Sequence, residues 1–372
     1  MKENAVIYQV FVRNYSQEGT FKEVEKDIDE IKSLGVDILY LMPIHEIGVI
    51  NRKGTFGSPY SIKDYFSISS DLGNKEDLIS LINKTHEKGM EIILDMVFNH
   101  TSYDNVLVFS HPDYYYYRDG RRANRVGDWS DICDLACEKD EVQSYLLIVL
   151  KYWKDLGIDG FRFDVASMIP LSFFKKARTL LGESTIFIGE SISNEFGDYL
   201  DSINVEHTED KMMFPTFDSL YNYSWFRSFT NYLKGYSSLE EFINIFNNDI
   251  VSTSNRGRRI NCLENHDNER IASFTTSEQL KSAIEFVSFI KGDLFIYAGQ
   301  EYGDTHKAEL FEKDPLNYEK NTTIYKWYKD AITYKRSQKE ILEQHLVQVS
   351  ENSFIAKVKY IDGTNEEKLF SF

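Results

Sequence analysis

The sequence predicts a (β/α)8 TIM-type barrel, and three observations favour this fold class. Apolar segments of strand character alternate with helix-like segments, and eight strands can be placed, each followed by a helix. The chain has 372 residues with 42% hydrophobic content, which is ample for one large core. Polar clusters end the third, fourth, fifth and seventh strands, whereas the alternative, an open doubly wound sheet, gathers its site at one switch point.

Each predicted strand is a short apolar run, and each predicted helix repeats apolar residues at helical spacing. The segment 21–35 is amphipathic, so we expect a helix there, while 212–217 is the least regular of the strands. In chain order the expected elements are strand 6–12, helix 21–35, strand 36–43, helix 75–89, strand 90–98, helix 141–157, strand 158–163, helix 172–181, strand 184–190, strand 212–217, helices 219–234 and 239–248, strand 258–264, helix 277–291, strand 293–299 and helix 323–336.

Two regions depart from this rhythm. The connection 101–139 is rich in Tyr, Arg and Asp and has no helical period, and a loop of this length is usually functional. Beyond residue 340 apolar and polar residues alternate as in a β-meander, but two or three strands are too few for a whole sandwich. We therefore expect a first barrel part (1–100), an insertion (101–139), a second barrel part (140–340) and the start of an incomplete β domain (341–372).

Composition narrows the classes of partner. The chain carries 42 Lys and Arg against 59 Asp and Glu, a formal charge of −17, which argues against nucleic acid or an anionic membrane as the partner. No apolar stretch approaches the roughly 20 residues of a spanning helix, and no secretory signal is visible, so we expect a cytoplasmic protein. Three cysteines, with Cys133 and Cys137 lacking companions at zinc-site spacing, are expected to be reduced and structural.

The four polar clusters carry the candidate chemistry. They are DMVFNH at 95–100, GFRFDVA at 160–166, FIGES at 187–191 and ENHD at 264–267. In each, an apolar run stops at polar residues, as expected where a strand tip opens into a polar cleft. Together they hold an arginine, two histidines and, in chain order, the candidate acids Asp164, Glu190 and Asp267. Two carboxylates are enough for glycoside hydrolysis.

Taken singly, these residues leave alternatives open. Arg162 and Asp164 are two apart on a strand and so share a face, where the guanidinium favours an ionised carboxylate or simply forms a strand-end ion pair. Glu190 ends an apolar strand, so it is expected at the barrel mouth, where apolar surroundings raise the pKa of a carboxyl group and suit a general acid. The same position also fits an exposed glutamate that begins a loop. Asp267 fits an ordinary helix cap as well as a site residue.

Taken together, the four ordered motifs resemble the α-amylase family of glycoside hydrolases, in its maltodextrin-active branch, across residues 5–340. The resemblance implies a small domain B inserted after the third strand, here 101–139, and a C-terminal β domain. It implies that Asp164 is the nucleophile, Glu190 the acid/base and Asp267 a stabiliser of the transition state. Among the other residues, it implies that Asp95 supports the site and that the sugar is bound by Tyr60, His100, Arg162 and His266.

Calcium is a possible cofactor on the same resemblance, because many members bind it through an asparagine at the position of Asn99. Calcium takes six to eight oxygen ligands, and Asp134 is the one further candidate in this sequence. We therefore expect that no cofactor is required.

The function expected from the resemblance is retaining hydrolysis of α-1,4 bonds in maltodextrins, with an α-glucan oligosaccharide as partner. A 4-α-glucanotransferase is the near alternative, because both share a covalent glycosyl-enzyme. A non-catalytic glycan-binding relative is the second alternative, although it requires a broken set of catalytic residues. Ser167 and Met168 stand where many α-amylases have a lysine and a histidine, so the contacts of a long starch chain on that side depart from the family.

Overall fold

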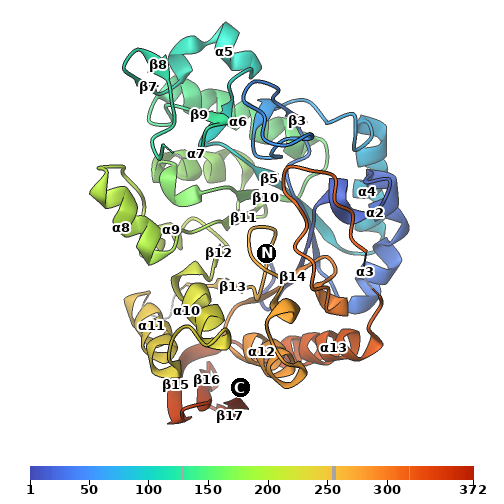
Figure 1. Cartoon of the computed structure of the whole chain (residues 1–372), viewed down its shortest axis with the longest axis vertical. Helices are drawn as coiled ribbons and strands as arrows, with labels where there is room; N and C mark the ends of the chain where they lie inside the picture. Colours follow the sequence, from blue (N-terminus) through green and yellow to red (C-terminus); the bar gives the residue numbers. More distant parts are fainter. Residues whose placement is uncertain (128, 254–256, 318) are drawn as a thin grey trace.

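The computed structural model describes residues 1–127, 129–253, 257–317 and 319–372. Eight parallel strands form a closed barrel, which confirms the predicted fold class, and β1 closes the ring by pairing with both β2 and β14 (Figure 1). The barrel strands are β1 (Val6–Val10), β2 (Ile38–Leu41), β5 (Glu91–Met96), β10 (Gly160–Phe163), β11 (Ile186–Gly189), β12 (Ser219–Tyr221), β13 (Arg259–Asn261) and β14 (Asp293–Tyr297).

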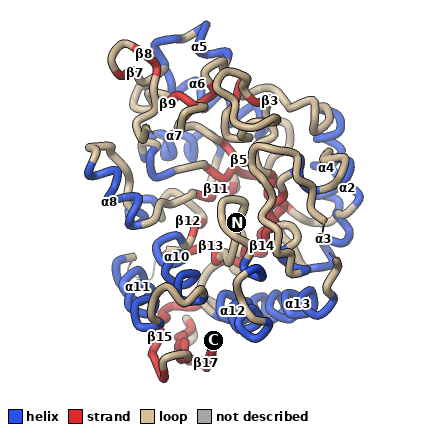
Figure 2. Tube along the Cα trace, in the orientation of Figure 1, coloured by secondary structure: helices blue, strands red, loops and turns tan. Residues whose placement is uncertain are grey.

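Helices surround the barrel as an outer layer (Figure 2). Every residue of β1, β2, β10 and β14 is buried, which explains why these strands are mostly apolar and do not alternate between apolar and polar residues. The helices are α1 (Val12–Tyr15), α2 (Phe21–Lys26), α3 (Ile28–Leu34), α4 (Lys75–Glu87), α5 (Val106–Ser110), α6 (Asp140–Asp155), α7 (Leu171–Leu181), α8 (Asn194–Ser202), α9 (Asp210–Met213), α10 (Tyr223–Leu233), α11 (Leu239–Ser252), α12 (Ser277–Phe289) and α13 (Thr322–Ser337). Among the described helices, none has both the length and the apolar character needed to cross a membrane.

The sixth strand was placed wrongly by the sequence. Residues 212–217 were expected to form it, but α9 ends there and the strand is β12, two residues further on. Pro215 has no N–H to donate to a strand ladder, so pairing with the neighbouring strands begins only after it. Leu220 then pairs with Gly189 on one side and Arg259 on the other.

The predicted helix 21–35 is broken into α2 and α3. The break lies at Asp27, whose backbone leaves the helical region at φ −94° and ψ 3°. The hydroxyl of Tyr15 donates a hydrogen bond to the Asp27 carboxylate at 3.0 Å, so the side chain at the break is held from outside the helix. The amphipathic pattern therefore identified the buried face but not the break.

The segment 101–139 forms a small lobe beside the third strand, at the top of Figure 1. Its frame is an antiparallel pair, β6 (His100–Ser102) with β9 (Ile132–Asp134), and a hairpin of β7 (Tyr117–Arg118) and β8 (Arg121–Arg122) extends from it. The segment also contains α5, which the sequence did not predict. A further short pair, β3 (Glu46–Ile47) with β4 (Ile62–Asp64), follows the second barrel strand.

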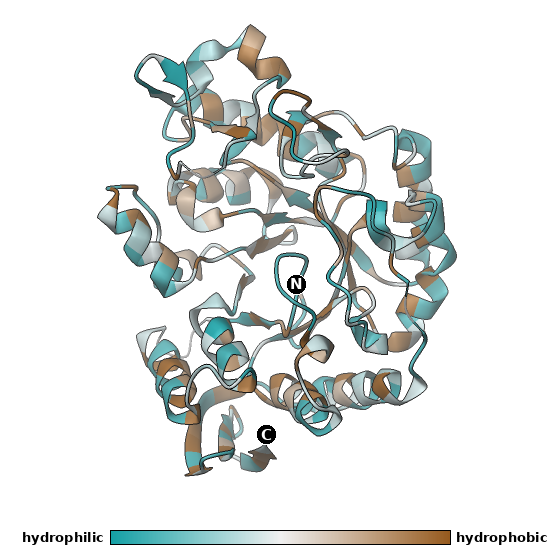
Figure 3. Ribbon diagram, in the orientation of Figure 1, coloured by the Kyte–Doolittle hydropathy of each residue, from teal (hydrophilic) through white to brown (hydrophobic). Residues whose placement is uncertain are grey.

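The C-terminal residues form the predicted meander, an antiparallel sheet of β15 (Ile341–Ser350), β16 (Ser353–Tyr360) and β17 (Asn365–Ser371). Alternate residues of β16 are buried, as expected for a sheet with one face on a core. That face packs on α11 and α12, where the rings of Phe354 and Phe286 lie 5.2 Å apart, and hydrophobic residues recur along α11 and β15 (Figure 3). The three cysteines are buried and free, as predicted.

Candidate active site

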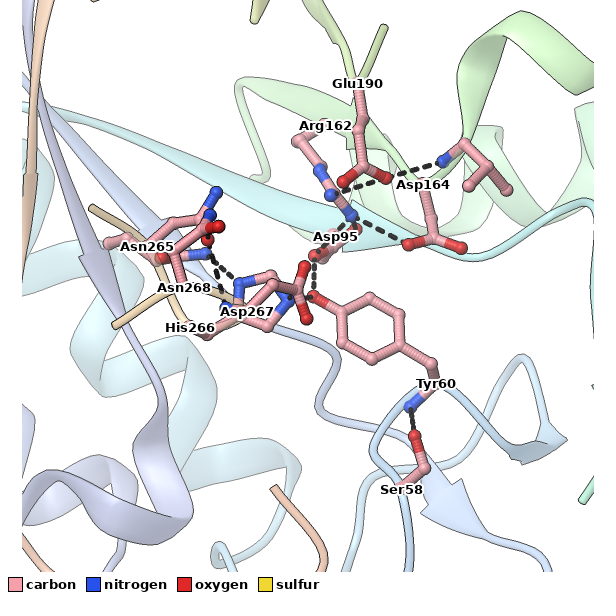
Figure 4. A network of polar contacts seen from close by, with 12 residues as sticks. Ser58, Tyr60, Asp95, Arg162, Asp164, Glu190, Asn265, His266, Asp267 and Asn268 are labelled. Carbon is pink, nitrogen blue, oxygen red and sulfur yellow. Dashed lines mark hydrogen bonds and ion pairs between the residues drawn. The ribbon is translucent and has the colours of Figure 1, made fainter. Parts of the chain in front are cut away.

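The candidate catalytic residues lie at the carboxyl ends of the barrel strands, where barrel enzymes place their chemistry. The strand ladder continues past the strand ends and fixes two of them: Asp164 donates its N–H to the Met96 carbonyl and Glu190 donates its N–H to the Phe163 carbonyl, each at 3.0 Å. Their side chains therefore project from adjacent strands toward the same space (Figure 4).

Arg162 is the centre of the site. Its Nη1 lies 2.7 Å from Asp95 Oδ1 and 3.1 Å from Asp164 Oδ1, and its Nη2 lies 2.8 Å from Glu190 Oε2. The guanidinium and Asp95 are fully buried, and Asp164 and Glu190 are each 7% exposed. One cation thus contacts three carboxylates, and the two proposed catalytic groups meet on the same guanidinium.

Burial sets the acid–base behaviour of this cluster. Burial raises the pKa of Glu190 to about 7, although Arg162 and the Val165 N–H oppose the shift. Burial and the charge of Glu190 also raise the pKa of Asp164, and they outweigh Arg162. The expectation that Arg162 keeps Asp164 ionised is therefore incomplete, because burial and the charge of Glu190 oppose the effect of Arg162 on the pKa of Asp164.

A hydrogen-bond chain supports the same cluster from the opposite side. Tyr60 donates its hydroxyl to Asp95 Oδ2 at 2.9 Å and lies 2.7 Å from His266 Nε2, and the two rings stack with centroids 5.3 Å apart. Gln9 Nε2 contacts His266 Nδ1 at 3.1 Å. Tyr40 donates to Asp95 Oδ2 at 2.6 Å. This chain holds Asp95, Tyr60 and His266 in one fixed arrangement.

The sequence did not identify Gln9 or Tyr40 as site residues. Each is the polar or amphipathic member of an apolar barrel strand, VIYQV and ILYL, and this is the signal by which they could have been found. A buried polar group needs a partner, and in a barrel that partner lies on another strand.

Asp267 is the most exposed of the predicted residues. Its side chain is 49% exposed, and its Oδ2 lies 3.1 Å from His266 Nε2. It does not cap a helix, because the next α-helix begins ten residues later and is capped by Thr276. The helix-cap alternative is therefore wrong, and Asp267 is free to meet a ligand.

His100 lies at the edge of this network, at the start of β6, and forms a hydrogen bond with the backbone of Tyr60. Its ring is 5.7 Å from the ring of Trp129, which comes from the insertion, and Asn99 Nδ2 is 3.3 Å from its Nδ1. Burial lowers the pKa of His100 to about 4, so the imidazole is neutral. The structure thus unites Tyr60, Asp95, Arg162, Asp164, Glu190, His266 and Asp267 in one network (Figure 4). His100 lies where this network meets the insertion, beside Trp129.

A cavity of about 460 Å³ adjoins this network. It is lined by Glu190 and Asp267, by the aromatic side chains Phe196, Tyr223 and Phe226, and by polar residues of α10. Ser167 and Met168, by contrast, line a separate cavity of about 470 Å³ between the insertion and residues 203–208. Ser167 and Met168, which stand in place of the lysine and histidine of many α-amylases, therefore affect a different cavity from the one beside Glu190.

The proposed calcium ligands do not fit a calcium ion. Asp134 accepts the backbone N–H of Arg125 at 2.8 Å, and the Arg125 guanidinium lies 3.4 Å from the same oxygen and 3.1 Å from the Leu135 carbonyl. Asn99 presents its amide nitrogen to Asp134 at 3.5 Å. Within the described residues no group of three His, Cys, Asp or Glu could hold a metal. The Arg125 guanidinium thus already contacts the Asp134 and Leu135 oxygens that a calcium ion would have to bind.

Comparison with known proteins identifies the family. The α-amylase catalytic domain matches residues 9–131 and 126–339. The chain belongs to the α-amylase family. An α-amylase from Lactobacillus plantarum of known structure is 34% identical, with a TM-score of 0.87, and the match covers 95% of this chain and 88% of that one. A maltogenic α-amylase from Thermotoga neapolitana is 29% identical, with a TM-score of 0.85 over 99% of this chain and 86% of that one.

Among family members known by sequence, a cyclomaltodextrinase from Thermoanaerobacter pseudethanolicus is 25% identical over 87% of this chain. The chain spans 58% of the length of that enzyme. An α-amylase from Dictyoglomus thermophilum is 24% identical over 99% of this chain, which spans 68% of its length.

Proposed function

We propose that this α-amylase family member is a retaining glycoside hydrolase that cleaves α-1,4 bonds in maltodextrins. The observation that carries the proposal is the convergence of Asp164 and Glu190 on one buried guanidinium, with burial raising the pKa of Glu190 to about 7. One group can attack while the other holds a proton at neutral pH.

In the first step, Asp164 attacks the anomeric carbon, the glycosidic C–O bond breaks, and the proton of Glu190 passes to the leaving oxygen. Asp164 then carries the sugar as an ester, and Glu190 is ionised. Arg162 contacts both carboxyl groups, so it keeps their positions fixed and stabilises the negative charge as it moves from Asp164 to Glu190. We assign Asp267 and His266 to binding hydroxyls of the reacting sugar, which their contact with each other supports.

In the second step, a water molecule gives a proton to Glu190 and forms the new bond to the anomeric carbon, which releases Asp164. A sugar hydroxyl in place of water gives transfer instead of hydrolysis, so a 4-α-glucanotransferase remains the alternative. The non-catalytic alternative is disfavoured because Asp164, Glu190 and Asp267 are all present around one site.

The names of the relatives support the substrate class. The two structures described above are an α-amylase and a maltogenic α-amylase, and the two sequence relatives are a cyclomaltodextrinase and an α-amylase. We therefore propose an α-glucan oligosaccharide as the substrate. Because the Arg125 guanidinium contacts the Asp134 and Leu135 oxygens, we also propose that calcium is not required. A cytoplasmic location stays a prediction.

The test is the configuration of the first product. Proton NMR during hydrolysis of maltotriose is expected to show the α-anomer first, and a first-formed β-anomer would contradict the nucleophilic role of Asp164. Asp164→Asn should lower kcat by at least about 10⁴-fold while circular dichroism shows a folded protein. Asp155→Asn, on the surface of α6, is the matched control and should keep full activity.

A further inference from the structure

The cavity of about 460 Å³ lies on one side of the catalytic pair. Its lining includes Glu190 and the neighbouring Val165, but neither Asp164 nor Tyr60 belongs to it. Under the proposed function, on which this inference rests, Glu190 protonates the oxygen of the departing sugar. A cavity that opens beside the acid and not beside the nucleophile is therefore placed to receive the leaving-group sugar.

The walls of this cavity suit a sugar ring. Tyr223 and Phe226 come from α10, with ring centroids 5.9 Å apart, and Phe196 comes from α8. Aromatic faces offer broad apolar contact to the C–H faces of a pyranose, while Asn231 and Asn268 in the same lining can bond its hydroxyls. The lining thus combines stacking surfaces with amide groups.

Phe196 differs from Tyr223 and Phe226 because it lies on α8 rather than α10 and packs against Trp129 of the insertion. The helix α8 stands away from the barrel in Figure 1. It contacts the insertion through two aromatic rings, those of Phe196 and Trp129, whose centroids lie 6.4 Å apart. Tyr199, one turn further along α8, donates its hydroxyl to the Val126 carbonyl at 3.1 Å. Trp129 in turn reaches the ring of His100.

We propose that Phe196, held in place by Trp129, is a specificity-determining residue that stacks on the sugar at the leaving-group side of the scissile bond. The same surface takes the acceptor when a sugar hydroxyl replaces water. In that transfer the acceptor gives its hydroxyl proton to Glu190, and its oxygen displaces Asp164 from the anomeric carbon, so the sugar that Phe196 binds decides how often transfer competes with hydrolysis.

Two substrates distinguish binding of the leaving-group sugar by Phe196 from a general contribution of Phe196 to catalysis. Maltotriose needs a sugar in the cavity, because glucose or maltose is its leaving group. α-Maltosyl fluoride needs none, because fluoride leaves without a sugar and without a proton from Glu190. For Phe196→Ala we expect kcat/KM to fall about tenfold on maltotriose, the size of one lost aromatic contact, and to change less than about twofold on the fluoride. The ratio of transfer to hydrolysis should fall as well.

Controls cover folding and nonspecific loss of a ring. Phe196→Leu keeps apolar volume without a ring face and should repeat the result if the alanine variant is unstable. Phe109→Ala removes a ring from the insertion that is 78% exposed and does not line the cavity, and it should match the unaltered enzyme on both substrates. Trp129→Ala should weaken maltotriose turnover in the same direction as Phe196→Ala.

Each result decides the proposal. Equal losses on the two substrates would show that Phe196 supports the catalytic pair rather than a departing sugar, and unchanged kinetics on both would show that the cavity is not used; either overturns the inference. If the unaltered protein turns over neither substrate, the proposed function itself fails, and the inference fails with it.

Discussion

Arg162 and Arg270 are both buried near the carboxyl ends of barrel strands, and both contact carboxylates, but their surroundings differ. Each nitrogen of Arg270 has a partner: Nε bonds to the His306 carbonyl, Nη1 to Glu264, and Nη2 to Asp304 and the Ala298 carbonyl. The second oxygen of Glu264 accepts the Ile271 N–H at 2.7 Å.

The Arg162 cluster is less complete. It has three carboxylates for one guanidinium, and Arg162 Nε is buried without a hydrogen-bond partner among the described residues. Glu190 lines the cavity of about 460 Å³ and Asp164 is 7% exposed, whereas Glu264 is fully buried. A buried arginine whose nitrogens all have partners is therefore read as structural, whereas one with an unpaired nitrogen and a carboxylate partner lining a cavity marks a candidate functional site.

Exchanging each arginine for leucine tests this contrast most strongly. Arg162→Leu leaves three carboxylates without their cation and should lower kcat/KM per folded molecule by at least about 10³-fold. Arg270→Leu should lower the free energy of unfolding by about 3–5 kcal/mol, the cost of breaking a buried pair, yet keep most of the specific activity. Urea unfolding and kinetics corrected for folded fraction measure both; equal activity losses would remove the distinction.

The hydroxyl of Tyr60 is expected to have the next largest effect, because it contacts both Asp95 and His266. Tyr60→Phe should reduce kcat/KM about 10- to 100-fold, as for loss of one or two hydrogen bonds to charged groups. Tyr360→Phe is the matched control, since Tyr360 donates to Glu366 in the C-terminal sheet and should leave kcat/KM unchanged. A large loss in the control would point to stability rather than the site.

The pH profile of kcat/KM should report the titration of Glu190 and Asp164. Glu190 must be protonated to act as an acid, and its pKa is about 7, so kcat/KM should fall about tenfold per pH unit above that value. Asp164 must be ionised, and its raised pKa should set the acid limb closer to neutral than an ordinary aspartate would. A plateau that ends at about pH 5 would mean that Glu190 has the pKa of an exposed glutamate.

The smallest effect concerns Arg125, a third arginine beside a buried carboxylate. Chelation with EDTA, or addition of calcium, should change neither activity nor melting temperature. Arg125→Gln should lower the free energy of unfolding by about 1–3 kcal/mol without rescue by calcium. Arg118→Gln, on the exposed hairpin, is the control. A calcium-dependent gain in melting temperature in the unaltered protein would show that ligands other than Asn99 and Asp134 exist.

Much of the fold could be predicted because its strands are continuous apolar runs that recur with helices between them. The sixth strand could not, since Pro215 interrupts an apolar run that otherwise suits a strand. Within the site, the contact of Arg162 with Asp164 follows from their spacing on one strand. The contacts of Gln9 with His266 and of Tyr40 with Asp95 could not be predicted, because they join distant strands, and spacing alone does not distinguish Arg162 from Arg270.

The closure of the barrel by β1 and β14 also has a consequence for synthesis on the ribosome. Val6 pairs with Leu294, so the first strand of the barrel cannot find its second neighbour until the last strand has been made. At about 5–20 residues per second, β1 waits about 15–60 s with one edge unpaired. The nascent chain must therefore keep an apolar strand from pairing elsewhere for most of its own translation.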